Sequence, residues 1–276
     1  MTLLNEPFFV VPIAIVVMAS VLRLLRRKPW RGAKTRYPIV LAHGVMGYGE
    51  LGFGKNRLSY FRGVGEHLKS RGVVVYQPQV PRTATVAERA RALADYVEAL
   101  EEPTVNIVAH SMGGLDARYA ISKLNLAPRV ASLTTIGTPH HGTPLADISA
   151  ELFGGKFGLR GLLTGVGLGA FYDLTTSKQI AFNRDVPNVN GIWYGCVIGD
   201  VDPQKATLHP LLGPAAKFLR ERVGRNDGLV PCKSQRWGRV LARIHADHWG
   251  EIGWSGGFDA PHFYERIAKK LRARGL

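Results

Sequence analysis

The sequence predicts an α/β fold with a mostly parallel central sheet that is covered by helices on both faces. Short apolar runs rich in strand-forming residues alternate along the chain with longer segments of helical periodicity. The strand-like runs are apolar throughout, as expected for parallel strands that are buried on both faces. The composition, 46% hydrophobic and 21% charged over 276 residues, is that of a globular chain long enough for one substantial domain.

The first 36 residues differ in character from the rest of the chain. Residues 8–22, FFVVPIAIVVMASVL, are almost wholly apolar, and Lys and Arg without any acid follow between Arg23 and Arg36. Such a segment would be about 22 Å long as a helix, and snorkelling of Arg23 would extend it towards about 27 Å. A cleaved signal peptide is the alternative, but the preceding MTLLNE carries an acid and no basic residue. We therefore expect residues 1–36 to form a transmembrane anchor with a basic flank, and residues 37–276 to form the globular domain.

The formal net charge of +15 suggests an anionic membrane surface as a partner. No basic face interleaved with aromatic residues is evident, so we expect no nucleic-acid partner and no obligate protein partner. Because the basic cluster follows the apolar segment, the positive-inside rule favours a single-pass protein whose globular domain faces the cytoplasm.

The elements beyond the N-terminal segment can be placed in order. We expect strands at 37–42, 73–78, 105–109, 130–139 and 193–200. We expect helices at 59–72, 85–102, 113–124 and 258–275, the second of which begins with Thr85 and Glu88 at capping-box spacing. Catalytic groups in such a sheet gather at the carboxyl ends of the strands.

Two serines compete as the nucleophile of an acyl-transfer enzyme. Ser255, in GWSGG, fits the pattern Gly-x-Ser-x-Gly, whereas Ser111, in AHSMGG, has Ala109 at the first position. However, a nucleophile elbow requires a strand before the serine and a helix after it, and only Ser111 has both. Ser255 also leaves too little chain for a following acid and base, which favours Ser111.

The acid and the base should follow Ser111 on loops after later strands. Asp200 and Asp202 are candidates, but Asp227 in NDGLVP is favoured because Asn-Asp-Gly is a turn sequence that would expose it at a loop tip. His248 is the favoured base, and His245 is the second choice. His262 and Asp259 come late in the chain, and a plain loop residue is the simpler interpretation of any one of these side chains.

An acyl-transfer site also needs two backbone N–H donors for the oxyanion. One is expected from Met112, directly after the nucleophile, and the other from Val45 in the loop after the first strand. Gly44 would let this loop approach the serine closely. We expect His43 to pack under the loop rather than to act as a base.

Five segments in this order resemble the bacterial true lipases, the family I triacylglycerol lipases of the α/β-hydrolase superfamily. The segments are YPIVLAHGVMG, VNIVAHSMGGLDARY, TTIGTPHHGTPLAD, NDGLVP and DHWGEIG, and the resemblance covers about residues 37–270. It implies an α/β-hydrolase fold, a triad of Ser111, Asp227 and His248, and an oxyanion hole formed by Val45 and Met112.

Two features depart from this family. Larger members bind a structural calcium partly through an aspartate two residues after the catalytic histidine, where this chain has Gly250. We therefore expect no cofactor or metal, with Asp202 and Glu251 as the remaining donors should calcium bind. Some members contain a disulfide, whereas Cys196 lies in an apolar strand-like run and is expected to be a free buried thiol.

The segment from about 143 to 190 is expected to form a mobile lid. Within it, residues 151–174 combine apolar side chains with a high density of glycine. Each glycine costs a helix about 1 kcal/mol relative to alanine, so a stable core helix, the alternative, is disfavoured. An apolar cover that meets lipid explains both features.

Together these features predict a membrane-anchored serine lipase or esterase that hydrolyses fatty-acid esters through an acyl-enzyme, with triacylglycerol as the favoured substrate. A carboxylesterase or phospholipid deacylase would use the same chemistry. The alternative from another class is a catalytically inactive scaffold that binds lipid at a membrane, which an intact triad argues against.

Overall fold

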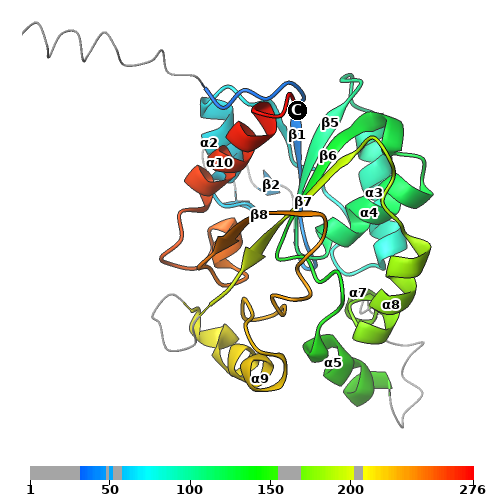
Figure 1. The fold of residues 1–276 in the computed structure, drawn as a ribbon, viewed down its shortest axis with the longest axis vertical. Helices are drawn as coiled ribbons and strands as arrows, with labels where there is room; N and C mark the ends of the chain where they lie inside the picture. The colour runs from blue at the N-terminus through cyan, green and yellow to red at the C-terminus, as the bar shows by residue number, and fades with distance from the viewer. Residues whose placement is uncertain (1–31, 48–49, 52–57, 155–168, 202–207) are drawn as a thin grey trace, which may run out of the picture. The chain divides into compact units, whose positions relative to one another are not determined.

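The fold was derived from a computed structural model, which describes residues 32–47, 50–51, 58–154, 169–201 and 208–276 (Figure 1). The predicted membrane segment falls within residues 1–31 and lies outside the described residues. Among the helices that are described, none has the length and apolar character needed to cross a membrane. Residues Ala33–Leu276 form one compact unit.

A six-stranded sheet forms the centre of this unit, in the order β4-β1-β5-β6-β7-β8 (Figure 1). Its strands are β1 (Ile39–Ala42), β4 (Val75–Tyr76), β5 (Val105–His110), β6 (Val130–Ile136), β7 (Trp193–Gly199) and β8 (Arg239–Ile244). Every neighbouring pair in this sheet is parallel. A separate antiparallel pair joins β2 (Glu50–Leu51) to β3 (Leu58–Ser59). The predicted parallel sheet is therefore confirmed.

Helices cover both faces of the sheet, as predicted. The described helices are α2 (Val64–Ser70), α3 (Val86–Glu98), α4 (Gly113–Lys123), α5 (Pro144–Gly154), α7 (Gly169–Asp173), α8 (Thr176–Asp185), α9 (Gly213–Val223) and α10 (Ala260–Arg272). The described residues also include the short 3-10 helices η1 (Ala127–Arg129), η2 (Pro210–Leu212) and η3 (Gly250–Ile252).

The two faces of β1 show how the core is divided. Ile39 and Leu41 point into the cluster formed with α2 and α10, while Val40 and Ala42 point into the cluster formed with α3 and α4. Successive side chains of a strand point to opposite faces, so an entirely apolar strand is what this position requires. Each such buried aliphatic side chain stabilises the fold by about 1.5–3 kcal/mol relative to an exposed one.

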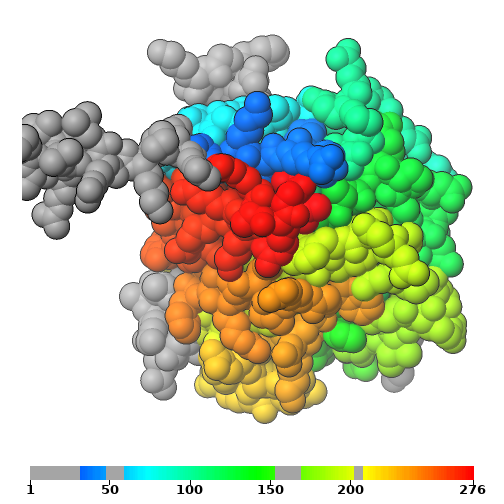
Figure 2. All heavy atoms as spheres, turned by 45° about the horizontal axis from the view of Figure 1, so that its top comes forward, coloured from blue at the N-terminus to red at the C-terminus, as the bar shows by residue number. Residues whose placement is uncertain are grey.

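The start and the end of this unit lie side by side. Figure 2 shows the first described residues against the C-terminal part of α10, and the Arg36 amide donates to the Leu276 carbonyl over 2.9 Å. The Ala33 amide donates in the same way to the carbonyl of Arg71 at the end of α2. Helix α10 therefore covers the same face of the sheet as α2.

Several predicted element boundaries need correction. The capping box of Thr85 and Glu88 is present, and Gly72 follows the end of α2 with a φ of +79°. The helix expected over 59–72 begins only at Val64, however, because Ser59 pairs in β3 and Gly63 adopts a φ of +69°. Strand β8 and helices α8 and α9 were not predicted.

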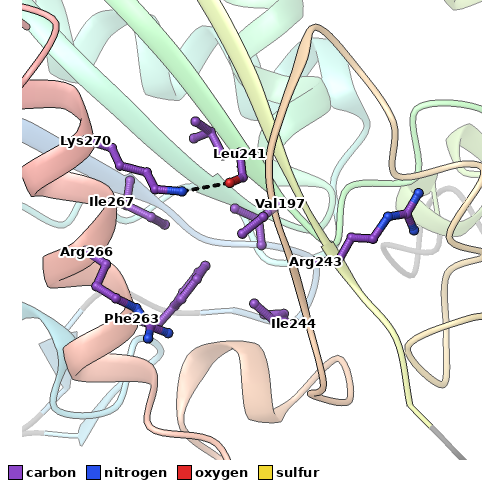
Figure 3. Close-up of a pocket in the computed structure, with 9 residues that line it drawn as sticks. Val197, Leu241, Arg243, Ile244, Phe263, Arg266, Ile267 and Lys270 are labelled. Carbon is purple, nitrogen blue, oxygen red and sulfur yellow. Dashed lines mark hydrogen bonds between the residues drawn. The ribbon is translucent and has the colours of Figure 1, made fainter.

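The edge strand β8 and helix α10 enclose a cavity of about 270 Å³ (Figure 3). Its lining is mainly apolar, with contributions from Val197, Leu241 and Phe263, and the Lys270 ammonium closes one side by donating to the Leu241 carbonyl over 2.7 Å. None of the predicted catalytic or oxyanion residues lines it. The cavity is therefore separate from the candidate site.

Candidate active site

Ser111 lies in a sharp turn between the end of β5 and the start of α4. Its φ is +55°, a left-handed conformation that is uncommon for a residue with a side chain. The turn is fixed on both sides, because the Ser111 amide donates to the Ile136 carbonyl over 2.9 Å and the Thr138 hydroxyl donates to the Ser111 carbonyl over 2.7 Å. Strain of this kind persists where the surroundings over-determine the backbone. The strand–turn–helix arrangement predicted for Ser111 is confirmed.

Close packing explains why small residues surround Ser111. A Cβ on Gly113 would lie 2.6 Å from the Ala42 carbonyl oxygen, and one on Gly44 would lie 2.7 Å from the Ser111 Cβ. Neither position can hold a larger side chain without movement of the backbone. Ala109 is fully buried, so the methyl group that departs from the Gly-x-Ser-x-Gly pattern is accommodated within the core.

The structure brings the three predicted catalytic side chains together. The His248 Nε2 lies 2.9 Å from the Ser111 Oγ, and the His248 Nδ1 lies 2.9 Å from the Asp227 Oδ2. All three residues are buried, with Ser111 and His248 each 5% exposed. With the proton on Nδ1, the imidazole donates to Asp227 and accepts from the serine hydroxyl, the arrangement that a general base needs.

Asp227 is buried rather than exposed at a loop tip, which corrects the expectation from its turn sequence. The carboxylate folds inward because its Oδ1 accepts the amides of Leu229 and Val230, over 2.9 and 2.7 Å, within its own turn. Its Oδ2 also accepts from Gln235 over 3.1 Å. These three hydrogen bonds fix the position of the carboxylate and leave Oδ2 aimed at His248.

The alternative residues are engaged elsewhere. The Ser255 hydroxyl donates to Asp247, and Asp200 pairs with Arg225. The side chain of His245 is exposed. His262 lies on α10 and Asp259 is the N-cap of that helix. Their side chains contact each other, with His262 Nδ1 2.7 Å from Asp259 Oδ2. Asp202 lies outside the described residues. Of the described candidates, only Ser111, Asp227 and His248 form a continuous chain of hydrogen bonds.

The loop after β1 lies beside the serine, as predicted. No described residue accepts a hydrogen bond from the Val45 or Met112 amide, so both donors remain available for an oxyanion. The loop is held by the Met46 amide, which donates to the Arg82 carbonyl over 2.8 Å. His43 is structural, since its Nε2 accepts the Val80 amide over 3.2 Å. Burial lowers the pKa of His43 to about 4, so the ring is neutral near pH 7.

A buried ion pair between Arg89 and Asp116 also holds the loop after β1. Arg89 on α3 donates to the His43 carbonyl over 2.8 Å and, through Nε, to Asp116 on α4 over 2.9 Å. Both side chains are almost fully buried. Burial raises the pKa of Asp116 to about 7, while the charge of Arg89 acts in the opposite direction. The Arg89–Asp116 pair links the loop after β1 to helix α4, which begins after Ser111. The sequence patterns did not predict this pair.

A second buried network, also not predicted, lies behind His248. Glu251 Oε2 is 3.0 Å from His110 Nε2, and His110 Nδ1 is 2.7 Å from the Tyr60 hydroxyl. Glu251 Oε2 is also 3.9 Å from His248 Nδ1. Burial, together with the charges of Asp227 and a neighbouring aspartate, raises the pKa of Glu251 well above its ordinary value. This shift favours the protonated carboxyl, which is the form that can donate to His110 Nε2.

The donors considered for calcium do not form a calcium site within the described residues. Glu251 is turned towards His110, and Asp202 lies outside the described residues. Calcium prefers six to eight oxygen ligands, and among the described residues Glu251 faces an imidazole nitrogen instead.

The predicted lid is described only at its two ends. Ala146 of α5, Ala170 of α7 and Leu174 pack in one apolar cluster with Met112 and Leu115 of the serine turn and α4. Residues 155–168, the most glycine-rich part, lie outside the described residues. The described ends are helical, as α5, α7 and α8, and the mobility of the lid stays a prediction.

Both cysteines are free and buried, as expected for Cys196. They pack with Ile198 in a small cluster. Burial, followed by the charges of nearby carboxylates, raises the pKa of Cys232 to about 12, so its thiol stays protonated at neutral pH.

Comparison with known proteins identifies relatives with one activity in common. A family model described as a domain of unknown function, DUF7379, matches residues 24–151. Triacylglycerol lipase 2 of Saccharomyces cerevisiae is 34% identical over 71% of this chain, which spans 63% of that protein's length. A triacylglycerol lipase of Vibrio cholerae is 31% identical and is aligned over 88% of this chain and 90% of its own.

Solved structures show the same fold. A metagenomic carboxyl esterase superposes with a TM-score of 0.72 at 19% identity, over 87% of this chain and 76% of its own. At this identity the likeness concerns the fold alone, whereas the Vibrio cholerae relative matches over nearly the whole length of both chains. The chain belongs to the triacylglycerol lipase family of the α/β-hydrolases.

Proposed function

We propose that this protein hydrolyses carboxylic esters of fatty acids with Ser111 as nucleophile, His248 as base and Asp227 as the acid that orients the imidazole. The observation that carries the proposal is the continuous hydrogen-bond chain from Ser111 through His248 to Asp227, in which both links measure 2.9 Å. The left-handed backbone of Ser111 at the start of a helix is the second support, because it presents the hydroxyl outside the sheet edge.

Acylation begins with proton transfer from the Ser111 Oγ to the His248 Nε2. The serine oxygen then attacks the ester carbonyl, and the amides of Val45 and Met112 stabilise the negative charge on the carbonyl oxygen. Asp227 stabilises the resulting imidazolium through its hydrogen bond to Nδ1. When the C–O bond to the alcohol breaks, His248 returns the proton to the leaving alkoxide, and the acyl group remains on Ser111.

Deacylation repeats these steps with water in place of serine. His248 removes a proton from a water molecule, which attacks the acyl carbonyl while the same two amides hold the oxyanion. Collapse of this intermediate releases the fatty acid and returns the proton to Ser111. Since one histidine acts as base and then acid in both halves, its orientation by Asp227 matters throughout.

Triacylglycerol is the substrate class that we favour. The Saccharomyces cerevisiae and Vibrio cholerae relatives carry that name, and the lid proposed over about 143–190 offers apolar side chains to a lipid. Two large apolar side chains of this segment, Leu152 of α5 and Ile180 of α8, are 73% and 75% exposed. Short-chain esters and phospholipids would use the same chemistry and must be separated by assay.

We further propose that residues 1–36 anchor the enzyme to a membrane, with the domain on the cytoplasmic side. The support is the sequence itself: an apolar segment at 8–22 and the basic residues from Arg23 to Arg36.

A matched ester series tests the proposed activity. Purified protein would be assayed on esters from short-chain acyl groups to triolein, with a phospholipid alongside. We expect turnover to rise with acyl-chain length and to fall by about 10⁶ in Ser111→Ala, with little change in Ser255→Ala. Hydrolysis of short-chain esters alone would mark a carboxylesterase, and hydrolysis of the phospholipid above triolein would mark a phospholipid deacylase. Absence of all turnover would contradict the proposal.

A further inference from the structure

Two helices that contain no catalytic residue bring two imidazoles and a carboxylate together at the surface. His67 lies on α2, while His262 and Glu265 lie three residues apart on α10 and so share one face of that helix. One nitrogen or oxygen atom from each of the three residues lies within 4.8 Å of the others. We call these three residues the α2–α10 cluster.

We propose that the α2–α10 cluster binds a zinc ion through His67, His262 and Glu265. Two imidazole nitrogens and one carboxylate oxygen form a ligand set that zinc accepts, with water in the fourth position. The site is distinct from the triad and is not needed for the proposed hydrolysis.

The described geometry is close to what zinc requires. His67 Nε2 and Glu265 Oε2 are 2.7 Å apart, and the rings of His67 and His262 have centroids 4.5 Å apart. Ligands at about 2.1 Å from a tetrahedral ion would be separated by about 3.4 Å. The His67–Glu265 contact must open by several tenths of an ångström, while His262 moves inward. Since the His262 side chain is 61% exposed, a rotation of this kind meets little packing resistance.

One imidazole already has the tautomer that a metal ligand needs. His262 Nδ1 lies 2.7 Å from the Asp259 Oδ2, so Nδ1 carries the proton and Nε2 is the nitrogen that a metal would take. A carboxylate behind a ligating histidine fixes its tautomer and raises its basicity. Asp259 is held in turn as the N-cap of α10, where it accepts the His262 amide over 3.2 Å.

Two cationic side chains contact the Glu265 carboxylate. Lys269 Nζ lies 2.6 Å from Glu265 Oε1, and Arg71 Nε lies 3.2 Å from Oε2. His67 also contacts Oε2, over 2.7 Å. Both carboxylate oxygens of Glu265 are therefore already directed towards cationic or nitrogen groups. Lys269, whose side chain is 51% exposed, competes with the metal and can swing into solvent.

Zinc at this position would link the two ends of the domain. Helix α2 follows the β2–β3 pair near the start of the unit, and α10 is its last helix. The two pack on one face of the sheet (Figure 1). A ligand that binds only the folded state stabilises it according to its concentration and affinity. The bound ion would therefore raise the melting temperature without changing the ester chemistry at Ser111.

Calorimetric titration of tag-free, EDTA-treated full-length protein with zinc chloride tests the proposal. We expect one zinc ion per chain and a higher melting temperature. Saturable binding should be lost in His262→Ala and in His67→Gln. Asp259→Asn should weaken binding by about 10-fold or more, because the histidine loses its orienting partner. Lys269→Met should bind more tightly than the parent, since a competing cation is gone.

Matched controls separate this site from adventitious binding. His245 is exposed on a loop outside the cluster, so His245→Ala should bind zinc as the parent does. Calcium should produce no heat of binding, because it prefers a larger set of oxygen ligands. Parent-like zinc affinity in both His262→Ala and His67→Gln, or no stoichiometric binding by the parent, would overturn the proposal. Ester hydrolysis is measured separately and does not decide it.

Discussion

At the scale of single residues, side chains of the same chemical type have different hydrogen-bond partners in and around the candidate site. Asp227 and Asp200 are both buried aspartates, yet Asp227 faces His248 and Asp200 faces Arg225. His248 lies between Ser111 and Asp227, whereas His245, three residues earlier, is exposed. The residue type alone therefore does not identify the candidate catalytic residues. Their hydrogen-bond partners do.

The first prediction compares these matched pairs. Asp227→Asn should lower kcat by about 10⁴, because the histidine would take the wrong tautomer, and His248→Ala should lower it further. Asp200→Asn and His245→Ala should stay close to the parent in ester hydrolysis. Loss of activity in Asp200→Asn with retention in Asp227→Asn would show that the acid has been assigned to the wrong turn.

The second prediction concerns the protonation of Glu251. Burial raises the pKa of Glu251 well above its ordinary value and so favours the protonated side chain, and Glu251→Gln should keep a donor to His110. Steady-state assays should show that Glu251→Gln turns over within a few-fold of the parent. Glu251→Ala should lose thermal stability, because it leaves the buried His110 Nε2 without its hydrogen-bond partner. If Glu251→Gln instead lost about two orders of magnitude in turnover, a negative charge would be required there.

At the scale of elements, the candidate site depends on how three of them meet. The loop after β1 must approach the turn between β5 and α4, and Gly44 and Gly113 make that approach possible. Arg89 on α3 then holds the loop through the His43 carbonyl and holds α4 through Asp116. The loop that holds the proposed oxyanion donor Val45 is thus positioned by a helix to which we assign no group of the chemistry.

The third prediction follows from this contact. Arg89→Met keeps most of the side-chain volume but removes the anchor of the loop, so kcat should fall by about 100-fold with little change in KM. Leaving Asp116 unpaired in the core should also destabilise the fold by about 3 kcal/mol. Arg91→Met, an exposed position on the same helix, is the matched control and should behave as the parent. An unchanged kcat in Arg89→Met would show that the loop does not depend on this arginine.

At the scale of the whole molecule, every residue assigned to the proposed chemistry lies within Ala33–Leu276. The sheet, the helices on its two faces and the loops at the carboxyl ends of the strands complete the site without the preceding segment. The proposed membrane anchor and the proposed hydrolase can therefore be tested apart.

The fourth prediction separates these two parts. Deletion of residues 1–30 should retain hydrolysis of a soluble ester, because no group of the candidate site is removed, while flotation with anionic vesicles should fall sharply. For the intact chain in sealed vesicles, protease added on the cytoplasmic face should cut the domain. Protection from that face, or vesicle binding that survives the deletion, would contradict the proposed anchor or its orientation.

Much of the fold and site could be predicted because the signals are local. The signal for the nucleophile turn extends over only a few residues: an apolar strand, a serine between small residues and the start of a helix. For this reason the sequence could distinguish Ser111 from Ser255. The capping box at Thr85 is equally local. Elements buried on both faces give continuous apolar runs, which is why the central strands were found.

The rest depended on contacts between distant residues or on exposed edges. Strand β8 lies at the sheet edge with Arg239, Val240 and Arg243 exposed, so its sequence lacks a continuous apolar run. The partner of Glu251 is His110, which is 141 positions away, and no local pattern joins them. The burial of Asp227 likewise depends on how its turn packs beneath His248, which a turn sequence alone does not specify.

Labelling with a fluorophosphonate probe, followed by peptide mapping, tests the central claim most directly. The probe reacts only with a serine that its surroundings have activated, so it reports the nucleophile without any assumption about the substrate. We predict that the label maps to Ser111, is lost in Ser111→Ala and is retained in Ser255→Ala. Label on Ser255, or full labelling of Ser111→Ala, would contradict the assignment of Ser111 as the nucleophile.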